Sequence, residues 1–182
     1  MLTMIANHLH KFPLKRPKPD PKNTHIAAAV LVVLHGQDDD PQVILTQRAF
    51  HLKSHAGEVA FPGGMWDQID EDLMQTALRE AQEEIGLAAD SVTLLATMPT
   101  SSPRRRDISV TPFVAVADSI LELNPDDGEI EAIFNAPLRN PISYSPPHQQ
   151  KLHLYHIYPP LPLLHWVPYQ MHSHYQYKAP LI

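Results

Sequence analysis

A short acidic segment in the middle of the chain has the residue types and spacing of a metal site. Residues 79–86 read REAQEEIG and contain Glu80, Glu83 and Glu84. Residues three and four positions apart share one face of a helix, so these three carboxylates converge within one turn. They lie near the helix C-terminus, where the helix dipole disfavours anions. Because converging carboxylate oxygens suit Mg²⁺ or Mn²⁺, we interpret the cluster as a divalent-metal site rather than a solvated acidic face.

The elements that must position this cluster follow from the apolar pattern. Apolar residues recur at helical spacing from Glu71 to Ile85, and Gly86 occupies the place of a left-handed C-terminal cap. A short strand is expected within residues 56–64, broken by Pro-Gly-Gly, and a second helix over residues 126–134. Longer strands are predicted at residues 24–35, 43–48, 92–98 and 109–116. This alternation predicts an α/β domain with a mixed sheet.

Composition narrows the class of protein. The chain has 182 residues with 20 acidic and 14 basic side chains, a net charge of −6, and no cysteine. The mild acidity argues against a nucleic-acid or anionic-membrane partner, since phosphate backbones favour clustered Lys and Arg. No apolar run approaches the ~20 residues that span a bilayer, and the N-terminus lacks a signal-peptide core. We therefore expect a soluble, cytoplasmic protein.

Proline usage divides the chain. Residues 1–24 form a Pro/Lys-rich lead-in, and we expect its proline cluster, residues 11–23, to be stiff and polyproline-like. Residues 25–147 carry the punctuation of an ordinary α/β domain and are the expected core. Residues 148–182 are rich in His, Tyr and Pro, and we expect them to pack on the same domain.

The acidic segment belongs to a longer pattern that resembles the Nudix box, G-x5-E-x7-R-E-U-x-E-E-x-G-U. From Glu71 onward the match is complete, whereas six residues stand between Gly64 and Glu71 where the consensus has five. The matching residues are Gly64, Glu71, Arg79, Glu80, Glu83, Glu84 and Gly86. The resemblance implies a Nudix hydrolase, with an α/β/α sandwich around a mixed β-sheet.

A second pattern lies directly upstream. Leu45–Gly64 reads LTQRAFHLKSHAGEVAFPGG. It resembles the motif of the coenzyme A pyrophosphatase branch, L-L-T-x-R-[SA]-x3-R-x3-G-x3-F-P-G-G. Ile44 replaces the first Leu, and Lys53 replaces the second Arg, which keeps the charge but loses the bidentate fork. The resemblance implies hydrolysis of coenzyme A or acyl-coenzyme A to 3′,5′-ADP and (acyl-)4′-phosphopantetheine.

The resemblance also implies roles for individual residues. Metal ligands would be Glu80 and Glu84 with the Gly64 carbonyl, and Glu83 would be a third ligand or would orient the attacking water. Arg79 would orient the carboxylates, and Glu71 would be structural or an outer metal contact. Glu129 is the expected general base, with Glu131 as the less favoured neighbour.

Substrate phosphates require cations. Arg48 and Lys53 come from the branch motif, and Arg104, Arg105 and Arg106 form a further basic loop that is either solvated surface or part of the substrate cleft. The expected partner is a nucleotide substrate of the coenzyme A type, and a homodimer is left open. The alternatives are a Nudix hydrolase of ADP-ribose or NADH and a non-catalytic nucleotide-binding module.

Overall fold

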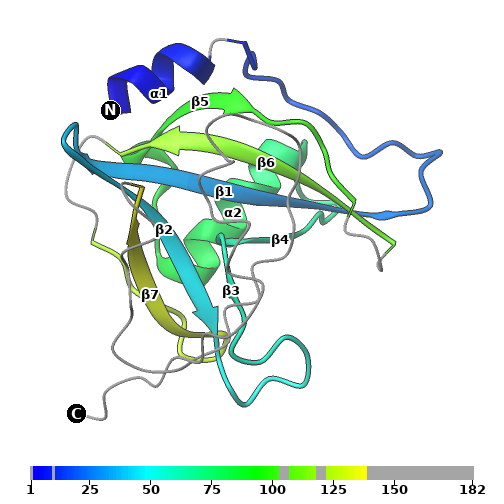
Figure 1. Cartoon of the computed structure of the whole chain (residues 1–182). Helices are drawn as coiled ribbons and strands as arrows, with labels where there is room; N and C mark the ends of the chain where they lie inside the picture. The colour runs from blue at the N-terminus through cyan, green and yellow to red at the C-terminus, as the bar shows by residue number, and fades with distance from the viewer. Residues whose placement is uncertain (1, 10, 103–106, 118–121, 139–182) are drawn as a thin grey trace.

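The computed structural model describes residues 2–9, 11–102, 107–117 and 122–138. Arg104–Arg106 and the segment 148–182 singled out above lie outside these residues. Within them the helices are α1 (Leu2–Leu9), α2 (Leu73–Ile85) and the short 3₁₀ turn η1 (Ala89–Ser91). The strands, shown in Figure 1, are β1 (Ile26–Gln37), β2 (Asp40–Arg48), β3 (Val59–Ala60), β4 (Gly63–Met65), β5 (Thr93–Thr97), β6 (Ile108–Val116) and β7 (Ile130–Pro137).

The strands form one mixed seven-stranded sheet. Its main order is β3-β2-β1-β6-β5, while β4 pairs with β1 and β7 pairs with β2. Only the β1–β6 pair of these is parallel, from Ile26↔Ile108 to Leu34↔Val116. β1 is apolar on both faces because both are covered: Leu31 and Val33 face the helix α2, whereas Val32 and Leu34 face the opposite core. The predicted mixed α/β sandwich is confirmed.

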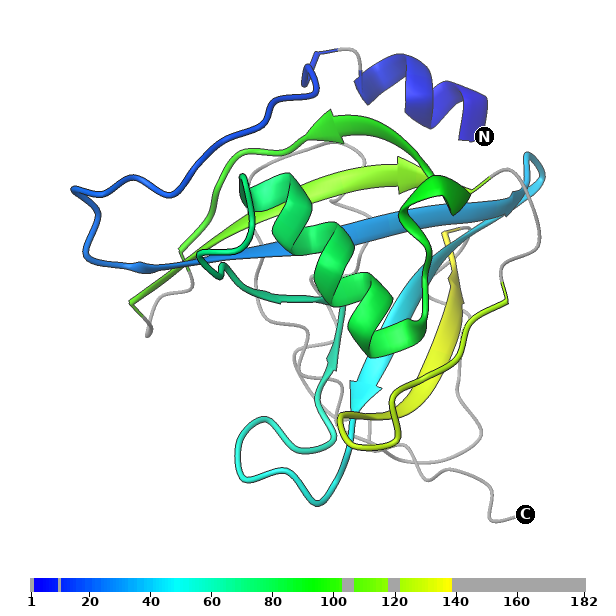
Figure 2. The same cartoon turned by 180° about the vertical axis from the view of Figure 1, so that it is seen from behind.

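Helix α2 carries the acidic segment and crosses one face of the sheet (Figure 2). It begins two residues later than predicted because Asp72 is its N-cap, accepting hydrogen bonds from the backbone N–H groups of Met74 and Gln75. Gly86 ends it in the left-handed conformation, with φ of 68°. The buried stripe that holds α2 on the sheet consists of Leu73, Met74, Ala77, Ala81 and Ile85.

The N-terminal region packs on the domain as well. Ile5 and Leu9 place α1, which the sequence did not predict, in the core on the sheet face opposite α2. In the lead-in, the backbone N–H and C=O of Lys15 both bond the Thr97 hydroxyl, at 2.7 and 2.8 Å. Arg16 Nε donates to Asp72 Oδ2 at 2.7 Å. The lead-in therefore ties the start of α2 to β5.

The predicted second helix over residues 126–134 is wrong. Residues 126–129 form a turn, in which the N–H groups of Glu129 and Ile130 donate to the Asp126 carbonyl. The chain then enters β7, which pairs antiparallel with β2, for example Leu45↔Phe134. The free edge of β2 supplies hydrogen bonds that outweigh local helix propensity. This pairing brings Glu129 to the end of β2.

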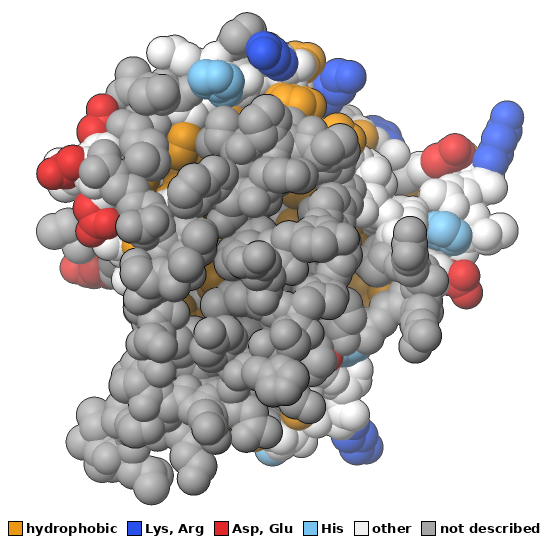
Figure 3. All heavy atoms as spheres, viewed as in Figure 1, with side chains coloured by type: hydrophobic (Ala, Val, Ile, Leu, Met, Phe, Trp, Pro, Cys, Tyr) orange, Lys and Arg blue, Asp and Glu red, His pale blue; other side chains and the backbone are white. Residues whose placement is uncertain are grey.

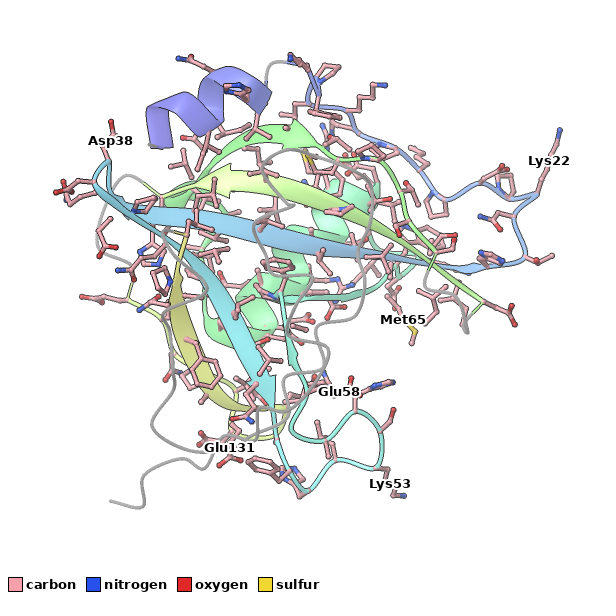
Figure 4. The ribbon with its side chains drawn as sticks, viewed as in Figure 1. Lys22, Asp38, Lys53, Glu58, Met65 and Glu131 are labelled. Atoms are coloured by element: carbon pink, nitrogen blue, oxygen red, sulfur yellow. The ribbon has the colours of Figure 1, made fainter. Side chains whose placement is uncertain are left out.

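One edge of the molecular surface carries acidic side chains (Figure 3). Acidic side chains of the exposed β1–β2 turn line one edge of the molecule (Figure 3), and Asp38 marks that turn in Figure 4. That edge is a solvated acidic surface, unlike the buried Glu84 of α2 described below. Among the described residues, no helix is long and apolar enough to cross a membrane.

Candidate active site

Glu84 is a buried carboxylate held by the Pro-Gly-Gly turn. Its side chain is 6% exposed, and its Oε2 accepts a hydrogen bond from the Gly63 N–H at 3.0 Å. Burial raises the pKa of the Glu84 carboxyl to about 7, and the charges of Glu80 and Glu129 add to this rise. The Gly63 N–H and the nearby Arg48 act in the opposite direction. The charged form of Glu84 is therefore disfavoured, and a further cation beside it would stabilise that form.

Glu80 lies one helical turn earlier, against the backbone of Gly64. A Cβ added to Gly64 would collide with the Glu80 carboxylate, so glycine is required for this close approach. Burial raises the pKa of Glu80, although hydrogen bonding and charge from Arg79 oppose the rise. Two carboxylates with raised pKa values thus meet consecutive glycines of strand β4.

The Arg79 guanidinium donates hydrogen bonds to neighbouring carboxylates. Its Nη1 donates to Glu80 Oε1 at 2.8 Å and to Glu83 Oε2 at 2.9 Å. Its Nε and Nη2 form a two-bond fork on Asp70, at 2.9 and 3.0 Å. Nη2 also donates to the carbonyl of Met65, the residue labelled on β4 in Figure 4. Arg79 therefore contacts two of the three helix carboxylates, Glu80 and Glu83.

Asp70 is a site residue that sequence reasoning missed. It is buried and accepts hydrogen bonds from Thr76 Oγ1 at 2.9 Å and from the Asp67 N–H at 3.2 Å, besides the Arg79 fork. Glu71, by contrast, is 77% exposed and pairs with Arg16 at 3.4 Å. A signal was present, because five residues separate Gly64 from Asp70, which is the box spacing counted from the glycine. Asp70 therefore anchors Arg79, whereas Glu71 pairs with Arg16 at the surface.

The donor chemistry of this site fits a hard divalent cation. Glu80 and Glu84 present carboxylate oxygens beside the backbone of β4, and burial disfavours their charged forms without a cation. The described residues nevertheless contain no complete group of three His, Asp or Glu in ligating positions. Glu83 is 60% exposed and turned to Arg79. Glu80 and Glu84 are thus the pair that would hold the cation.

Strands β2 and β7 bring Arg48 and Glu129 to the same place. Arg48 Nη1 lies 3.6 Å from Glu84 Oε1 and 3.9 Å from Glu129 Oε2. The Ala49 N–H donates to the Glu129 carbonyl at 2.8 Å, which fixes the β7 turn beside the end of β2. Lys53 is exposed at the tip of the β2–β3 connection and points away from the domain (Figure 4). The structure thus places Arg48 at the cluster and Lys53 outside it.

Replacing Gly64 with alanine should damage the site without unfolding the protein. The atoms nearest to the new Cβ all belong to the flexible end of the Glu80 side chain, which can move aside. We expect the rate of pyrophosphate hydrolysis, the activity that the sequence resemblance implies, to fall about 100-fold, since small misplacements of catalytic groups have effects of this size. The melting temperature, measured by circular dichroism, should change little.

Gly63→Ala is the contrasting variant. Its Cβ would collide with the backbone of Ala29 and Val30, and Gly63 has a φ of 153°. We expect Gly63→Ala to lower the free energy of unfolding by more than about 1 kcal/mol. Equal melting temperatures for the two variants would contradict the assigned contacts.

The fold and the site together define a mixed α/β domain with an oxygen-rich acidic site at a helix packed on a Pro-Gly-Gly turn. A family model described as the NUDIX domain matches residues 24–154. An uncharacterized Nudix hydrolase NudL of Yersinia pestis (strain Pestoides F) is 35% identical over 158 residues, covering 82% of this chain and 78% of its relative. The chain belongs to the Nudix family, whose hydrolases act on phosphorus-containing anhydrides.

Solved structures agree with this assignment. A Nudix hydrolase from M. smegmatis, RenU, has the same fold, with a TM-score of 0.53 and 24% identity over 64% of this chain and 73% of that one. The NUDIX domain of Shewanella oneidensis NrtR, complexed with ADP ribose, gives a TM-score of 0.51 and 25% identity over 66% of this chain and 79% of that one.

Proposed function

We propose that this Nudix hydrolase cleaves the pyrophosphate of coenzyme A or acyl-coenzyme A, producing 3′,5′-ADP and (acyl-)4′-phosphopantetheine. The proposal rests on one observation: the Nudix box and the branch motif of this chain lie next to each other in the structure. Arg48, from the branch motif, lies 3.6 Å from Glu84 of the Nudix box. The glycines that end the branch motif contact Glu84 and Glu80. Arg48 and the two glycines of the branch motif therefore lie beside the glutamates of helix α2.

The proposed chemistry assigns a task to each group. A bound Mg²⁺ or Mn²⁺ would neutralise the pyrophosphate and lower the pKa of the attacking water. Glu80 and Glu84 would hold the cation with the Gly64 carbonyl, and Glu83 would serve as a third ligand or orient the water. Arg79, anchored by Asp70, would orient Glu80 and Glu83. Arg48 would bind a phosphate of the substrate beside the carboxylates. Lys53, which lies outside the carboxylate cluster, and the loop Arg104–Arg106 stay proposed substrate contacts.

Glu129 is proposed as the general base that takes the proton of the attacking water. Its side chain is 56% exposed and lies near Arg48, so it is accessible to solvent beside the carboxylate pair. Glu129→Gln should lower kcat about 100-fold, the usual contribution of a general base. The KM for coenzyme A should change little, because the amide keeps the shape of the side chain.

Glu131→Gln is the matched control for this assignment. Glu131 is exposed on β7, two residues from Glu129 (Figure 4), and should keep the normal rate. A near-normal kcat in Glu129→Gln, or a loss confined to Glu131→Gln, would remove Glu129 from the mechanism.

Substrate preference is tested by steady-state kinetics on coenzyme A, ADP-ribose and NADH, each with Mg²⁺ or Mn²⁺. We expect kcat/KM for coenzyme A to exceed kcat/KM for ADP-ribose and NADH by at least about tenfold. ADP-ribose and NADH lack the 3′-phosphate, so the residues that bind this phosphate would have no partner in those substrates. A preference for ADP-ribose would overturn the coenzyme A proposal and leave the metal site intact.

ADP-ribose is the second candidate substrate. It shares the ADP pyrophosphate with coenzyme A, and the NUDIX domain of S. oneidensis NrtR is complexed with it. A non-catalytic nucleotide-binding module is disfavoured because every glutamate of the box is present. A cytoplasmic location and a homodimer stay predictions.

A further inference from the structure

The side chain of Arg48 faces two carboxylates from different elements. Its Nη1 lies 3.6 Å from Glu84 on α2 and 3.9 Å from Glu129 at the start of β7. Both distances are longer than a hydrogen bond, so Arg48 acts here as a nearby charge rather than a fixed donor. Glu84 is 6% exposed, and a carboxylate so buried needs a positive neighbour. Arg48 supplies this charge, and the Gly63 N–H adds a hydrogen bond.

The backbone of Arg48 is fixed, but its guanidinium is not. Its N–H donates to the Glu58 carbonyl at 2.9 Å, and its carbonyl accepts from the Gly57 N–H at 3.0 Å. The pairing of β2 with β7 changes register between Gln47 and Arg48, where β2 ends. The side chain is 29% exposed. Arg48 can therefore reorient its long side chain without any movement of the strand.

We propose that Arg48 is an exchangeable counter-cation: in the metal-free protein its single positive charge is shared between Glu84 and Glu129, and a divalent cation displaces it. This inference rests on the proposed function for the fate of Arg48, since the released guanidinium then turns to a substrate phosphate. A cation at Glu84 repels a positive charge close to the same carboxylate. Metal binding and phosphate binding are thereby coupled through one side chain.

Direct measurement of Mn²⁺ binding without substrate tests the exchange. Free Mn²⁺ is followed by electron paramagnetic resonance at pH 8.5, where carboxylates are ionised. Arg48→Gln should bind Mn²⁺ about tenfold more tightly than the wild type, because the competing charge is gone. Arg48→Lys, which keeps the charge, should restore the wild-type Kd.

Lys22→Gln is the control for the loss of one positive charge. Lys22 is exposed in the lead-in, far from α2 in Figure 4. Salt screens such exposed charges, so its Kd should stay within about twofold of the wild type. An unchanged or weaker Kd for Mn²⁺ in folded Arg48→Gln overturns the exchange. So does equal tightening in Lys22→Gln.

A second measurement on the wild type covers the case in which Arg48→Gln fails to fold. The Nε–H resonance of Arg48, assigned by its absence in Arg48→Lys, should shift on saturation with Mg²⁺. A resonance that does not shift overturns the proposal. These readouts use no substrate, so they are independent of the proposed function. If Arg48→Gln binds Mn²⁺ more tightly but the wild type does not hydrolyse coenzyme A, the exchange is supported and the proposed substrate is refuted.

Discussion

Replacing Glu84 with glutamine should lower kcat for pyrophosphate hydrolysis about a thousandfold, or about 4 kcal/mol of transition-state stabilisation. The amide keeps the shape of the side chain and can still accept the hydrogen bond from the Gly63 N–H. It cannot, however, supply the negative oxygens of a metal ligand. Single-turnover hydrolysis at saturating Mg²⁺ measures the loss.

Two controls separate lost chemistry from lost structure. The melting temperature of metal-free Glu84→Gln at pH 8 should equal or exceed that of the wild type, because the amide removes a charge that is 6% exposed. Glu71→Gln changes the same residue type within the box, but its side chain is 77% exposed. Its kcat should stay within about twofold, since surface ion pairs contribute little. Equal losses in both variants would contradict the assignment of Glu84.

Replacing Asp70 with asparagine should have the largest effect on stability. Asp70 receives the Arg79 fork, the Thr76 hydroxyl and the Asp67 N–H, and its side chain is 4% exposed. Removing one partner of a buried ion pair costs about 3–5 kcal/mol. Because Arg79 would no longer be fixed, kcat should also fall about 10–100-fold. Urea unfolding and steady-state kinetics measure the two effects.

Asp67→Asn is the matched control for Asp70. Asp67 is exposed, and its side chain bonds only a local backbone group, the Ile69 N–H at 3.1 Å, among the contacts seen here. Its substitution should change the free energy of unfolding by no more than about 0.5 kcal/mol. If Asp70→Asn were no less stable than Asp67→Asn, the role of Asp70 as the anchor of Arg79 would be wrong.

The same ion pair predicts a pH dependence. Burial alone would raise the pKa of Asp70, but hydrogen bonds from Arg79, Asp67 and Thr76 outweigh it and hold the pKa below its ordinary value of 3.8. A lowered pKa stabilises the folded protein above the unfolded-state value, and this is lost as the pH falls through the folded-state value. The stability gap between wild type and Asp70→Asn should therefore shrink only below about pH 3.8.

Much of the fold was predictable because its elements are locally encoded. The period of apolar residues and Gly86 locate α2, and the long apolar run locates β1. Strand β7 was not found, since residues 126–134 have no decisive period and their pairing with β2 depends on a partner more than 80 residues away. Helix α1 was missed because tertiary packing of Ile5 and Leu9, rather than propensity, holds it.

The candidate site, too, is only partly predictable from the sequence. Glu80 and Glu84 are identifiable because helical spacing alone puts them on one face. The closeness of Arg48 to Glu129 cannot be identified from the sequence, since it arises from the β2–β7 pairing. The Arg79–Glu83 pair follows from its i,i+4 spacing. The anchoring of Arg79 by Asp70 depends on side-chain geometry that no spacing rule specifies.

Identifying the products formed from coenzyme A tests the central claim most directly. Purified protein with Mg²⁺ or Mn²⁺ is incubated with coenzyme A, and the products are separated by anion-exchange chromatography, with Glu84→Gln in parallel. We predict stoichiometric 3′,5′-ADP and 4′-phosphopantetheine from the wild type and neither from the variant. Intact coenzyme A with both proteins, under conditions where the wild type hydrolyses ADP-ribose, would contradict the account.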